Sequence, residues 1–172
     1  MLREATDDDV PAMRRWRNHE KVRAVSLTTH EIDADEHLAW WGRVKQDPTR
    51  IVLIYEHDGV PAGVVTFSDL LTDPETGERT ADWSFYLDTD GVEAAGTALH
   101  AWMGIERDAV AHAFDVLGIQ VLRGVTLSEN TAVRQLHKRF GFTEIRDFAH
   151  EIDGVATPIV QTELRVENRR AR

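Results

Sequence analysis

The chain has 172 residues, of which 42% are hydrophobic and 29% charged, and a chain of this size can bury the core of one folded domain. Its 30 Asp and Glu outnumber its 20 Lys and Arg and give a formal net charge of −10, which disfavours extended binding to nucleic acid or to anionic membranes. It contains no cysteine, which excludes disulfides, zinc–thiolate sites and a cysteine nucleophile.

The amino-terminal part of the chain is predicted to form two helices before any strand. Thr6 or Asp7 can cap the first helix, and Asp33 with Glu36 has capping-box spacing at the start of the second. The apolar residues expected to face the core are Val10, Met13 and Trp16 in the first helix and Leu38, Trp41 and Val44 in the second. Their spacing of about three residues fits one face of a helix.

Three strands are predicted to follow. Residues 51–55 are rich in β-branched side chains, and residues 63–67 form a similar run. The Asp-Gly sequence in the turn at 57–59 joins these two runs as a β-hairpin. Residues 71–80 contain Asp-Pro and Thr-Gly and are predicted to be a loop, and residues 82–87 are predicted to be the third strand.

A long helix is predicted from about residue 97 to residue 117, after a loop at residues 88–96. Five apolar residues are expected on one face of this helix: Leu99, Met103, Val110, Phe114 and Leu117. Gly118 is expected to end it, because glycine readily adopts the left-handed conformation found just after helices.

The remaining elements are a strand at 121–127, a helix at 130–140 and a last hairpin formed by residues 142–151 and 155–166 across an Asp-Gly turn. This order predicts a mixed α/β fold, in which a mostly antiparallel sheet is flanked by helices and contains one strand–helix–strand crossover. In such a unit the loop before the helix is the natural ligand site.

Residues 1–166 are expected to form a single domain, and residues 167–172 a frayed, disordered tail. No segment approaches the roughly 20 consecutive apolar residues of a membrane span, and the amino-terminal residues lack the apolar run of a signal peptide. We therefore expect a cytoplasmic protein that binds neither nucleic acid nor membrane and is a monomer or a homodimer.

Two motifs in the carboxyl-terminal half resemble those of a known family. Residues 94–99 read Ala-Ala-Gly-Thr-Ala-Leu, and residues 130–142 read Asn-Thr-Ala-Val-Arg-Gln-Leu-His-Lys-Arg-Phe-Gly-Phe. They are similar to the acetyl-CoA loop and the later helix of the GCN5-related N-acetyltransferases (GNAT). Residues 16–23 and 32–40 resemble the branch of ribosomal-protein N-terminal acetyltransferases and acetyltransferases of nucleotide-linked amino sugars. The resemblance covers the whole chain and implies the GNAT fold, with the acetyl-CoA site at the crossover.

The resemblance implies that acetyl-CoA is the co-substrate. The residues that would contact it are Phe85, Tyr86, Leu87, Gly91, Ala94, Ala95, Gly96, Thr97, Asn130 and Arg134. The loop departs from the family pattern, because Gly91 replaces a basic residue or glutamine and Ala94 replaces a glycine, so weaker pyrophosphate binding is expected. Asn130 could instead be an ordinary helix cap, and Arg134 a solvated charge.

His137 is the candidate catalytic residue. In the family an amine attacks the thioester directly, so the departing thiolate needs a proton from a general acid and the oxyanion needs N–H donors. That acid is usually a tyrosine four residues before the glycine of Phe-Gly-Phe, which is the position of His137. Imidazole, with an unperturbed pKa near 6.5, can donate a proton near neutrality. In the alternative interpretation His137 is a half-buried residue that only stabilises the helix.

Two further departures from the family leave questions open. The long helix exceeds the family's by one or two turns, so Gly104 is a candidate break and an insertion could lie between His100 and Glu106. Val125 occupies the position where many relatives carry a glutamate base. Four side chains could act as the base through water: His30, Asp69, Asp82 and Glu129. Each could equally be a solvated surface residue, and the amine could enter already neutral.

The candidate acceptor-binding residues are Asn18, His30, Trp40 and Asp82. We expect the acceptor to be a primary amine of a small molecule, such as an amino sugar. One alternative is the terminal amine of a protein. Another is a catalytically weak GNAT-fold domain that binds coenzyme A or a protein partner, with its five tryptophans as interface anchors. No metal is expected, because the pairs His30-Glu31 and Glu36-His37 lack a third ligand.

Overall fold

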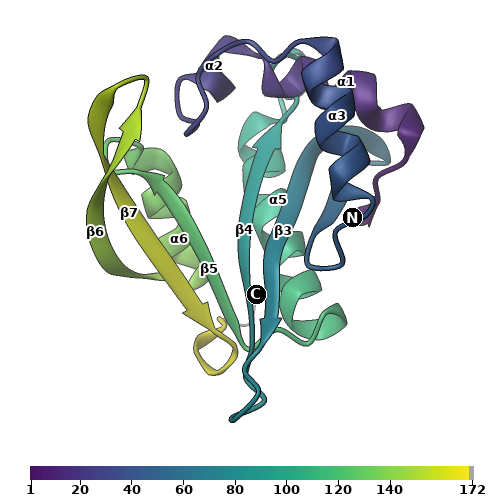
Figure 1. Ribbon diagram of the computed structural model, residues 1–172. Helices are drawn as coiled ribbons and strands as arrows, with labels where there is room; N and C mark the ends of the chain where they lie inside the picture. The colour runs from purple at the N-terminus through teal and green to yellow at the C-terminus, as the bar shows by residue number, and fades with distance from the viewer. Residues whose placement is uncertain (171–172) are drawn as a thin grey trace.

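The computed structural model describes residues 1–170 and contains a seven-stranded sheet in the order β1-β2-β3-β4-β5-β7-β6. The strands are β1 (Leu2–Glu4), β2 (Ile51–His57), β3 (Val60–Thr72), β4 (Arg79–Leu87), β5 (Val121–Leu127), β6 (Thr143–Ile152) and β7 (Val155–Arg165). Neighbouring strands are antiparallel except β4 and β5, which are parallel. The predicted mixed α/β fold with one parallel crossover is therefore confirmed (Figure 1).

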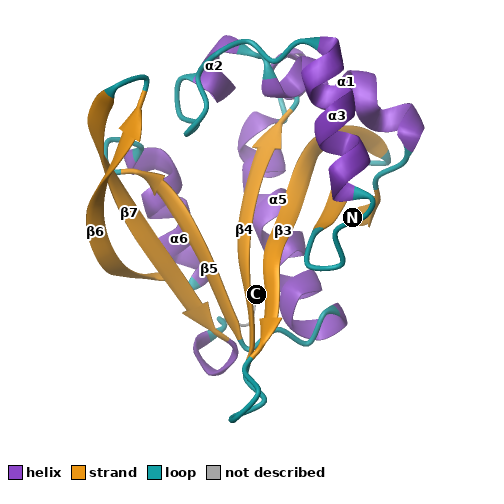
Figure 2. Cartoon of the chain, in the orientation of Figure 1, coloured by secondary structure: helices purple, strands orange, loops and turns teal. Residues whose placement is uncertain are grey.

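Helices cover both faces of the sheet (Figure 2). The α-helices are α1 (Val10–Arg17), α2 (Glu20–Arg23), α3 (Ala34–Val44), α4 (Thr89–Ala94), α5 (Ala98–Ala111) and α6 (Thr131–Phe140). Short 3-10 turns are η1 (Asp7–Asp9) and η3 (Val166–Asn168), and η2 (His112–Val116) is a π-helical turn. In residues 1–170 no helix is long and apolar enough to cross a lipid bilayer.

Each face of the sheet has its own hydrophobic core. On one face α1 and α3 pack against the strands through Val10, Met13, Trp16, Trp41, Val44, Val52, Ile54 and Val64. On the other face α5 and α6 contribute Ile105, Ala109, Leu136 and Phe140, which pack with Phe67, Trp83 and Leu122. Successive strand residues point to opposite faces, so the strands supply side chains to both cores. The predicted buried face of α1 is confirmed.

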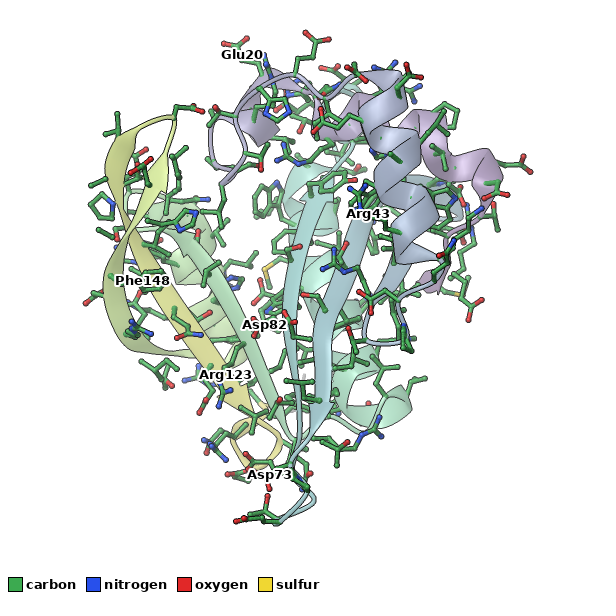
Figure 3. All side chains as sticks on the ribbon, in the orientation of Figure 1. Glu20, Arg43, Asp73, Asp82, Arg123 and Phe148 are labelled. Atoms are coloured by element: carbon green, nitrogen blue, oxygen red, sulfur yellow. The ribbon has the colours of Figure 1, made fainter. Side chains whose placement is uncertain are left out.

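Strands β4 and β5 pair over a short distance and then separate. Their register runs only from Thr80 opposite Val121 to Asp82 opposite Arg123. Asp82 and Arg123, both labelled in Figure 3, mark the last paired position. Beyond it the two strands diverge as in the letter V (Figure 1). The facing edges of β4 and β5 therefore lack a strand partner where the cavity described below begins.

Both predicted hairpin turns are confirmed. Asp58 and Gly59 have φ angles of 52° and 80°, and Asp153 and Gly154 have φ angles of 50° and 77°. Two consecutive residues with positive φ give the turn whose twist matches that of the flanking strands.

Two residues that were predicted to be in the core are exposed. Leu38 of α3 is 56% exposed, because the buried face of that helix is formed by His37, Trp41 and Val44 at i, i+4 and i+7. Leu99 is 71% exposed, because it lies in the first turn of α5, ahead of the positions that pack on the sheet. The buried positions of α5 and η2 are mostly small or aliphatic: Ala101, Gly104, Ile105, Ala109, Val110 and Ala113. Such a stripe lets the helix approach the strands closely.

The long helix has no break at Gly104. Its carboxyl-terminal end instead changes to the π-helical turn η2, which ends before Gly118, whose φ is 64°. The predicted loop at 88–96 is wrong in part, because it contains α4. The predicted loop at 71–80 is shorter, because β3 and β4 extend into it.

The amino-terminal strand β1 and the short helix α2 were not predicted. Within the predicted tail, Glu167 and Asn168 belong to η3, and Arg169 forms an ion pair with Asp115, so this part is folded rather than frayed. Residues 171–172 lie outside the described residues. The assignment of residues 1–166 to a single domain stays a prediction.

Replacing Gly104 by alanine should destabilise the fold. A Cβ at this position would overlap the hydroxyl oxygen of Tyr55 and lie 3.2 Å from its Cζ, and overpacking of this kind costs roughly 1–3 kcal/mol. Urea unfolding should therefore show a lower free energy of unfolding for Gly104→Ala. Adding Tyr55→Phe should recover part of the loss, because it removes the overlapping oxygen.

The matched control is Gly42→Ala in α3, where a Cβ would meet nothing within 4 Å. There alanine should stabilise the helix by up to about 1 kcal/mol. Equal effects of the two substitutions would contradict the close approach of α5 to Tyr55.

Candidate active site

A cavity of about 430 Å³ lies where β4 and β5 separate. Its walls come from β4 at Trp83–Leu87, from β5 at Gly124–Leu127, and from α2 with the segment that follows it. Trp102 of α5 and His137 of α6 also line it. The cavity is thus bounded by elements that lie on opposite faces of the sheet.

His137 is held at the cavity wall by α6. Asn130 caps this helix by accepting a hydrogen bond from the Val133 N–H at 3.3 Å, and Gly141 ends it with a φ of 103°. The His137 side chain is 7% exposed and packs against the rings of Trp83 and Phe142, at centroid distances of 5.5 and 5.0 Å. The imidazole is therefore fixed in orientation by aromatic neighbours.

A buried carboxyl group contacts the histidine. Oε1 of Glu106 lies 2.9 Å from Nδ1 of His137, and the Glu106 side chain is 0% exposed. This contact uses Nδ1, so Nε2 is the ring nitrogen left for a ligand. Within residues 1–170 the second carboxyl oxygen of Glu106, Oε2, is buried with no hydrogen-bond partner.

Burial raises the pKa of the Glu106 carboxyl, and the hydrogen bond and charge of His137 offset only part of that rise. A charged carboxylate in an apolar core is costly unless it is paired. The sequence analysis did not identify Glu106 as a site residue. The available signal was an acidic residue on the otherwise apolar stripe between Ile105 and Ala109.

The end of β4 forms one edge of the cavity. Phe85, Tyr86 and Leu87 all line it, and β5 does not pair with β4 at these positions. Main-chain groups on that edge can therefore bind a ligand, as at any unpaired strand edge. Burial raises the pKa of the Tyr86 phenol, so this group is neutral at physiological pH.

The segment after β4 differs from the predicted loop. Asp88 caps α4 by accepting a hydrogen bond from the Gly91 N–H at 3.2 Å, and a Cβ on Gly91 would overlap that carboxylate. Gly91 therefore makes room for a helix cap, and its amide is already occupied by an anion of the chain itself.

The free amides are found one element later. Gly96, with a φ of 69°, leads into α5. The hydrogen bonds of this helix begin with the Ala101 N–H, which donates to Thr97 O at 2.9 Å. The N–H groups of Ala98, Leu99 and His100 have no acceptor within the helix. Such a helix start favours an anion.

The comparison with known families identifies the protein class. The family described as Acetyltransferase (GNAT) domain matches residues 1–143. The chain belongs to this family. It is an N-acetyltransferase, and GNAT acetyltransferases use acetyl-CoA.

Individual relatives are distant in sequence but similar in fold. The chain is 22% identical over 150 residues to the acetyltransferase PseH of Campylobacter jejuni, covering 86% of this chain and 87% of PseH. It resembles the spermidine N-acetyltransferase of Vibrio cholerae, solved with CoA and spermine, with a TM-score of 0.79, 14% identity and 98% and 96% of the two chains covered. It also resembles yncA of Salmonella typhimurium, solved with acetyl-CoA, with a TM-score of 0.72, 22% identity and 99% and 96% covered.

The cavity of this GNAT acetyltransferase includes only part of the predicted cofactor site. His137, Asn130 and the end of β4 line it. The predicted residues that do not line it are Gly91, Ala94, Ala95, Gly96, Thr97 and Arg134. Arg134 forms an ion pair with Glu144 at 2.8 Å and donates to Ser128 O at 2.6 Å, so its guanidinium already has partners. Asn130 both caps α6 and lines the cavity, so its two predicted roles are compatible.

None of the four predicted acceptor-binding residues, all within residues 1–170, lines the cavity. Asn18 exchanges two hydrogen bonds of 2.8 Å with the backbone of Ile32. His30 contacts Glu36 on the surface at 3.0 Å, and Trp40 stacks on His37. Asp82 lies on β4 at the last pair with β5. The structure therefore gives each of them a place outside the cavity.

The other candidate bases, Asp69 and Glu129, do not line the cavity either. Among residues 1–170 no group of three or more His, Asp or Glu side chains is placed to hold a metal ion. Sequence reasoning also missed Arg17, which lines the cavity from α1 and was noted in the sequence only as part of a family motif.

The raised pKa of Glu106 predicts how stability depends on pH. The folded state keeps this proton to higher pH than the unfolded chain does, so the contribution of Glu106 to stability falls as the pH rises above its ordinary pKa of 4.5. Glu106→Gln cannot ionise. As the pH rises above 4.5, urea unfolding should show wild type losing stability relative to Glu106→Gln.

The control is Glu129→Gln, which changes an exposed carboxyl and should leave the pH profile of wild type unchanged. If wild type and Glu106→Gln had parallel profiles, the carboxyl would not be held protonated by its surroundings.

Proposed function

We propose that this N-acetyltransferase transfers the acetyl group of acetyl-CoA to a primary amine of a small molecule, with an amino sugar as the first candidate. The observation that carries the proposal is the cavity between β4 and β5, which is bounded by His137 on one face of the sheet and by α1 and α2 on the other. A donor and an acceptor that entered from opposite faces would meet at the unpaired edge of β4.

The donor side offers groups suited to coenzyme A. The amides of Ala98, Leu99 and His100 at the start of α5 would bind its pyrophosphate, because a helix start favours anions. The free edge of β4 at residues 85–87 would bind its amide-containing arm and supply an N–H donor to the oxyanion. Acetyl-CoA supplies the activated thioester, and the chain supplies the amides that would bind it.

Direct transfer needs two proton movements. The neutral amine attacks the thioester carbonyl, the carbon–sulfur bond breaks, and the amine nitrogen releases a proton to water while the thiolate gains one. His137 would donate the proton to sulfur from Nε2, since Nδ1 contacts Glu106. Glu106 would act as a positioning residue, because its hydrogen bond with Nδ1 keeps the imidazole oriented.

The rim of the cavity favours a small acceptor over a protein terminus. The segment after α2 and the turn between β6 and β7 are joined by a hydrogen bond from the Thr29 hydroxyl to Asp153. This contact ties the segment after α2 to the β6–β7 hairpin, and a cavity of about 430 Å³ is in the range of small-ligand sites. The amino-terminal resemblance to acetyltransferases of nucleotide-linked amino sugars supports an amino sugar.

One observation favours the second candidate, a coenzyme A-binding domain with weak turnover. The amide of Gly91, expected at phosphate, is bonded to Asp88, and Asp90 and Glu93 add negative charge to the same helix. Carboxylates so close to a pyrophosphate would lower its affinity. Binding and turnover therefore need separate measurements.

Acetyl-CoA should raise the melting temperature of the protein. A ligand that binds only the folded state stabilises it by RT ln(1 + [L]/Kd), about 2.7 kcal/mol at one hundred times Kd. Gly96→Trp should abolish most of the rise by placing a bulky side chain before the start of α5. Gly77→Trp is the matched control, because Gly77 has a similar φ of 73° and equally open surroundings. The absence of a rise at millimolar acetyl-CoA would refute the cofactor assignment.

His137→Ala should lower kcat by about 10² to 10⁴, the usual range for a lost general acid or base, while leaving acetyl-CoA affinity nearly unchanged. His137→Tyr should keep much of the activity, because it restores the family's usual acid. Glu106→Gln should lower kcat less than His137→Ala does. The measurement is free-thiol release per folded molecule with an amine panel. A fall in melting temperature with unchanged kcat in the His137 variants would assign the residue a purely structural role.

A further inference from the structure

Arg17 lies at the carboxyl-terminal end of α1 and lines the cavity. It belongs to the face of the sheet that α1 and α3 cover, where Tyr86 and Val64 pack with them. His137 belongs to the opposite face, with α5 and the core around Trp83. Arg17 is therefore on the acceptor side of the gap between β4 and β5.

Arg17 interacts electrostatically with Glu36 but forms no close ion pair within residues 1–170. Its Nη2 donates to the backbone carbonyl of Thr28 at 2.9 Å, its Nη1 is buried with no hydrogen-bond partner, and no carboxylate forms an ion pair with it there. Several other arginines of this acidic chain do have such pairs: Arg3, Arg50, Arg107, Arg123, Arg134, Arg165 and Arg169.

A second guanidinium lies close by. The Arg23 Nη1 donates to Thr29 O at 3.4 Å, and its Nε is buried without a partner in the described chain. Burial lowers the pKa of Arg17 and the positive charge of Arg23 lowers it further, while interactions with Tyr86 and Glu36 offset part of this shift. By contrast Lys21, which also lines the cavity, is paired with Glu93 at 2.6 Å. Of these three cations, Arg17 and Arg23 therefore lack a close ion pair in the described residues, whereas Lys21 has one.

Such an arrangement is costly in the absence of an anion. A guanidinium remains protonated in proteins. When it is partly buried without a counterion it loses bound water, and hydrogen bonds to carbonyl oxygens compensate for that loss only in part. The planar fork of arginine matches a carboxylate or a phosphate, to which it can donate two parallel hydrogen bonds. An anionic ligand would supply the charge and the acceptor atoms that the chain does not.

We propose that the acceptor amine carries an anionic group, a carboxylate or a phosphate, and that Arg17, supported by Arg23, binds this group. The inference rests on the proposed acetyl transfer and names the substrate class for it. With the anion bound on the α1 side, the amine is directed into the gap toward the edge of β4. An amine whose only charges are positive is disfavoured at this rim.

The experiment compares kcat/KM, by free-thiol release, for amines matched in shape but not in charge. The pairs are L-serine with L-serinamide, and glucosamine 6-phosphate with glucosamine, while 1,4-diaminobutane represents a purely cationic amine. The first pair tests a carboxylate and the second a phosphate. Wild type should prefer the anionic member of at least one pair and disfavour the diamine.

Arg17→Met should lower kcat/KM for the preferred anionic amine about 10- to 100-fold, the range expected for a lost hydrogen bond to a charged group, and should change the neutral partner less than about twofold. Arg17→Lys should be intermediate, because it keeps the charge but loses the fork. Arg15→Met, two residues earlier on the same helix and exposed, is the control and should behave as wild type. If Arg17→Met does not fold, Arg17→Lys and Arg23→Met carry the comparison.

Equal kcat/KM within both pairs, or equal loss on the charged and neutral amines in Arg17→Met, would overturn the inference and leave the proposed acetyl transfer standing. If no amine is turned over, melting temperatures decide, measured with sodium phosphate or acetate against chloride at constant ionic strength. An anion-specific rise that Arg17→Met removes and Arg15→Met retains would support the site. The same rise in all three proteins, or none in wild type, would overturn it.

Discussion

Strands β4 and β5 share only three register pairs, from Thr80–Val121 to Asp82–Arg123, and the site depends on their separation beyond that point. Unpaired strand edges present N–H and C=O groups that must find other partners. Here those edges face a cavity rather than another strand. The same separation opens the sheet from one face to the other, so groups on α6 and on α1 can act on one reaction centre.

The two polar features that flank this opening are both incompletely satisfied by the chain. Within the described residues, Glu106 is buried and has one oxygen without a hydrogen-bond partner, and Arg17 has a buried nitrogen without one. Both groups are explained by their place at the cavity. Glu106 forms a hydrogen bond with His137, and Arg17 lines the cavity on the side proposed for the acceptor. Unsatisfied buried groups commonly mark function, because packing alone would not retain them.

Local signals predicted much of the fold, and non-local contacts account for the errors. Glycine positions in the sequence predicted two hairpin turns and one helix end, because glycine readily adopts positive φ. These are the turns at Asp58–Gly59 and Asp153–Gly154 and the end of α6 at Gly141. The exposure of Leu38 and the burial of His37 depend on which side of α3 meets the sheet. Glu106 could not be paired with His137 from the sequence, because 31 residues separate them. The helix α4 was hidden by its resemblance to a loop motif.

The acceptor-side rim also explains how a chain of net charge −10 can present positive charge at one place. Arg17 and Arg23 donate to the backbone carbonyls of Thr28 and Thr29, and these neutral oxygens satisfy hydrogen-bond geometry without cancelling the charge. The segment is therefore held in place while the guanidinium charge stays available to a ligand. Glu36 interacts electrostatically with Arg17 without pairing with it, and salt at physiological concentration screens acidic residues that lie more than about 8 Å away. The local charge at the rim therefore depends on Arg17 and Arg23 rather than on the net charge of the chain.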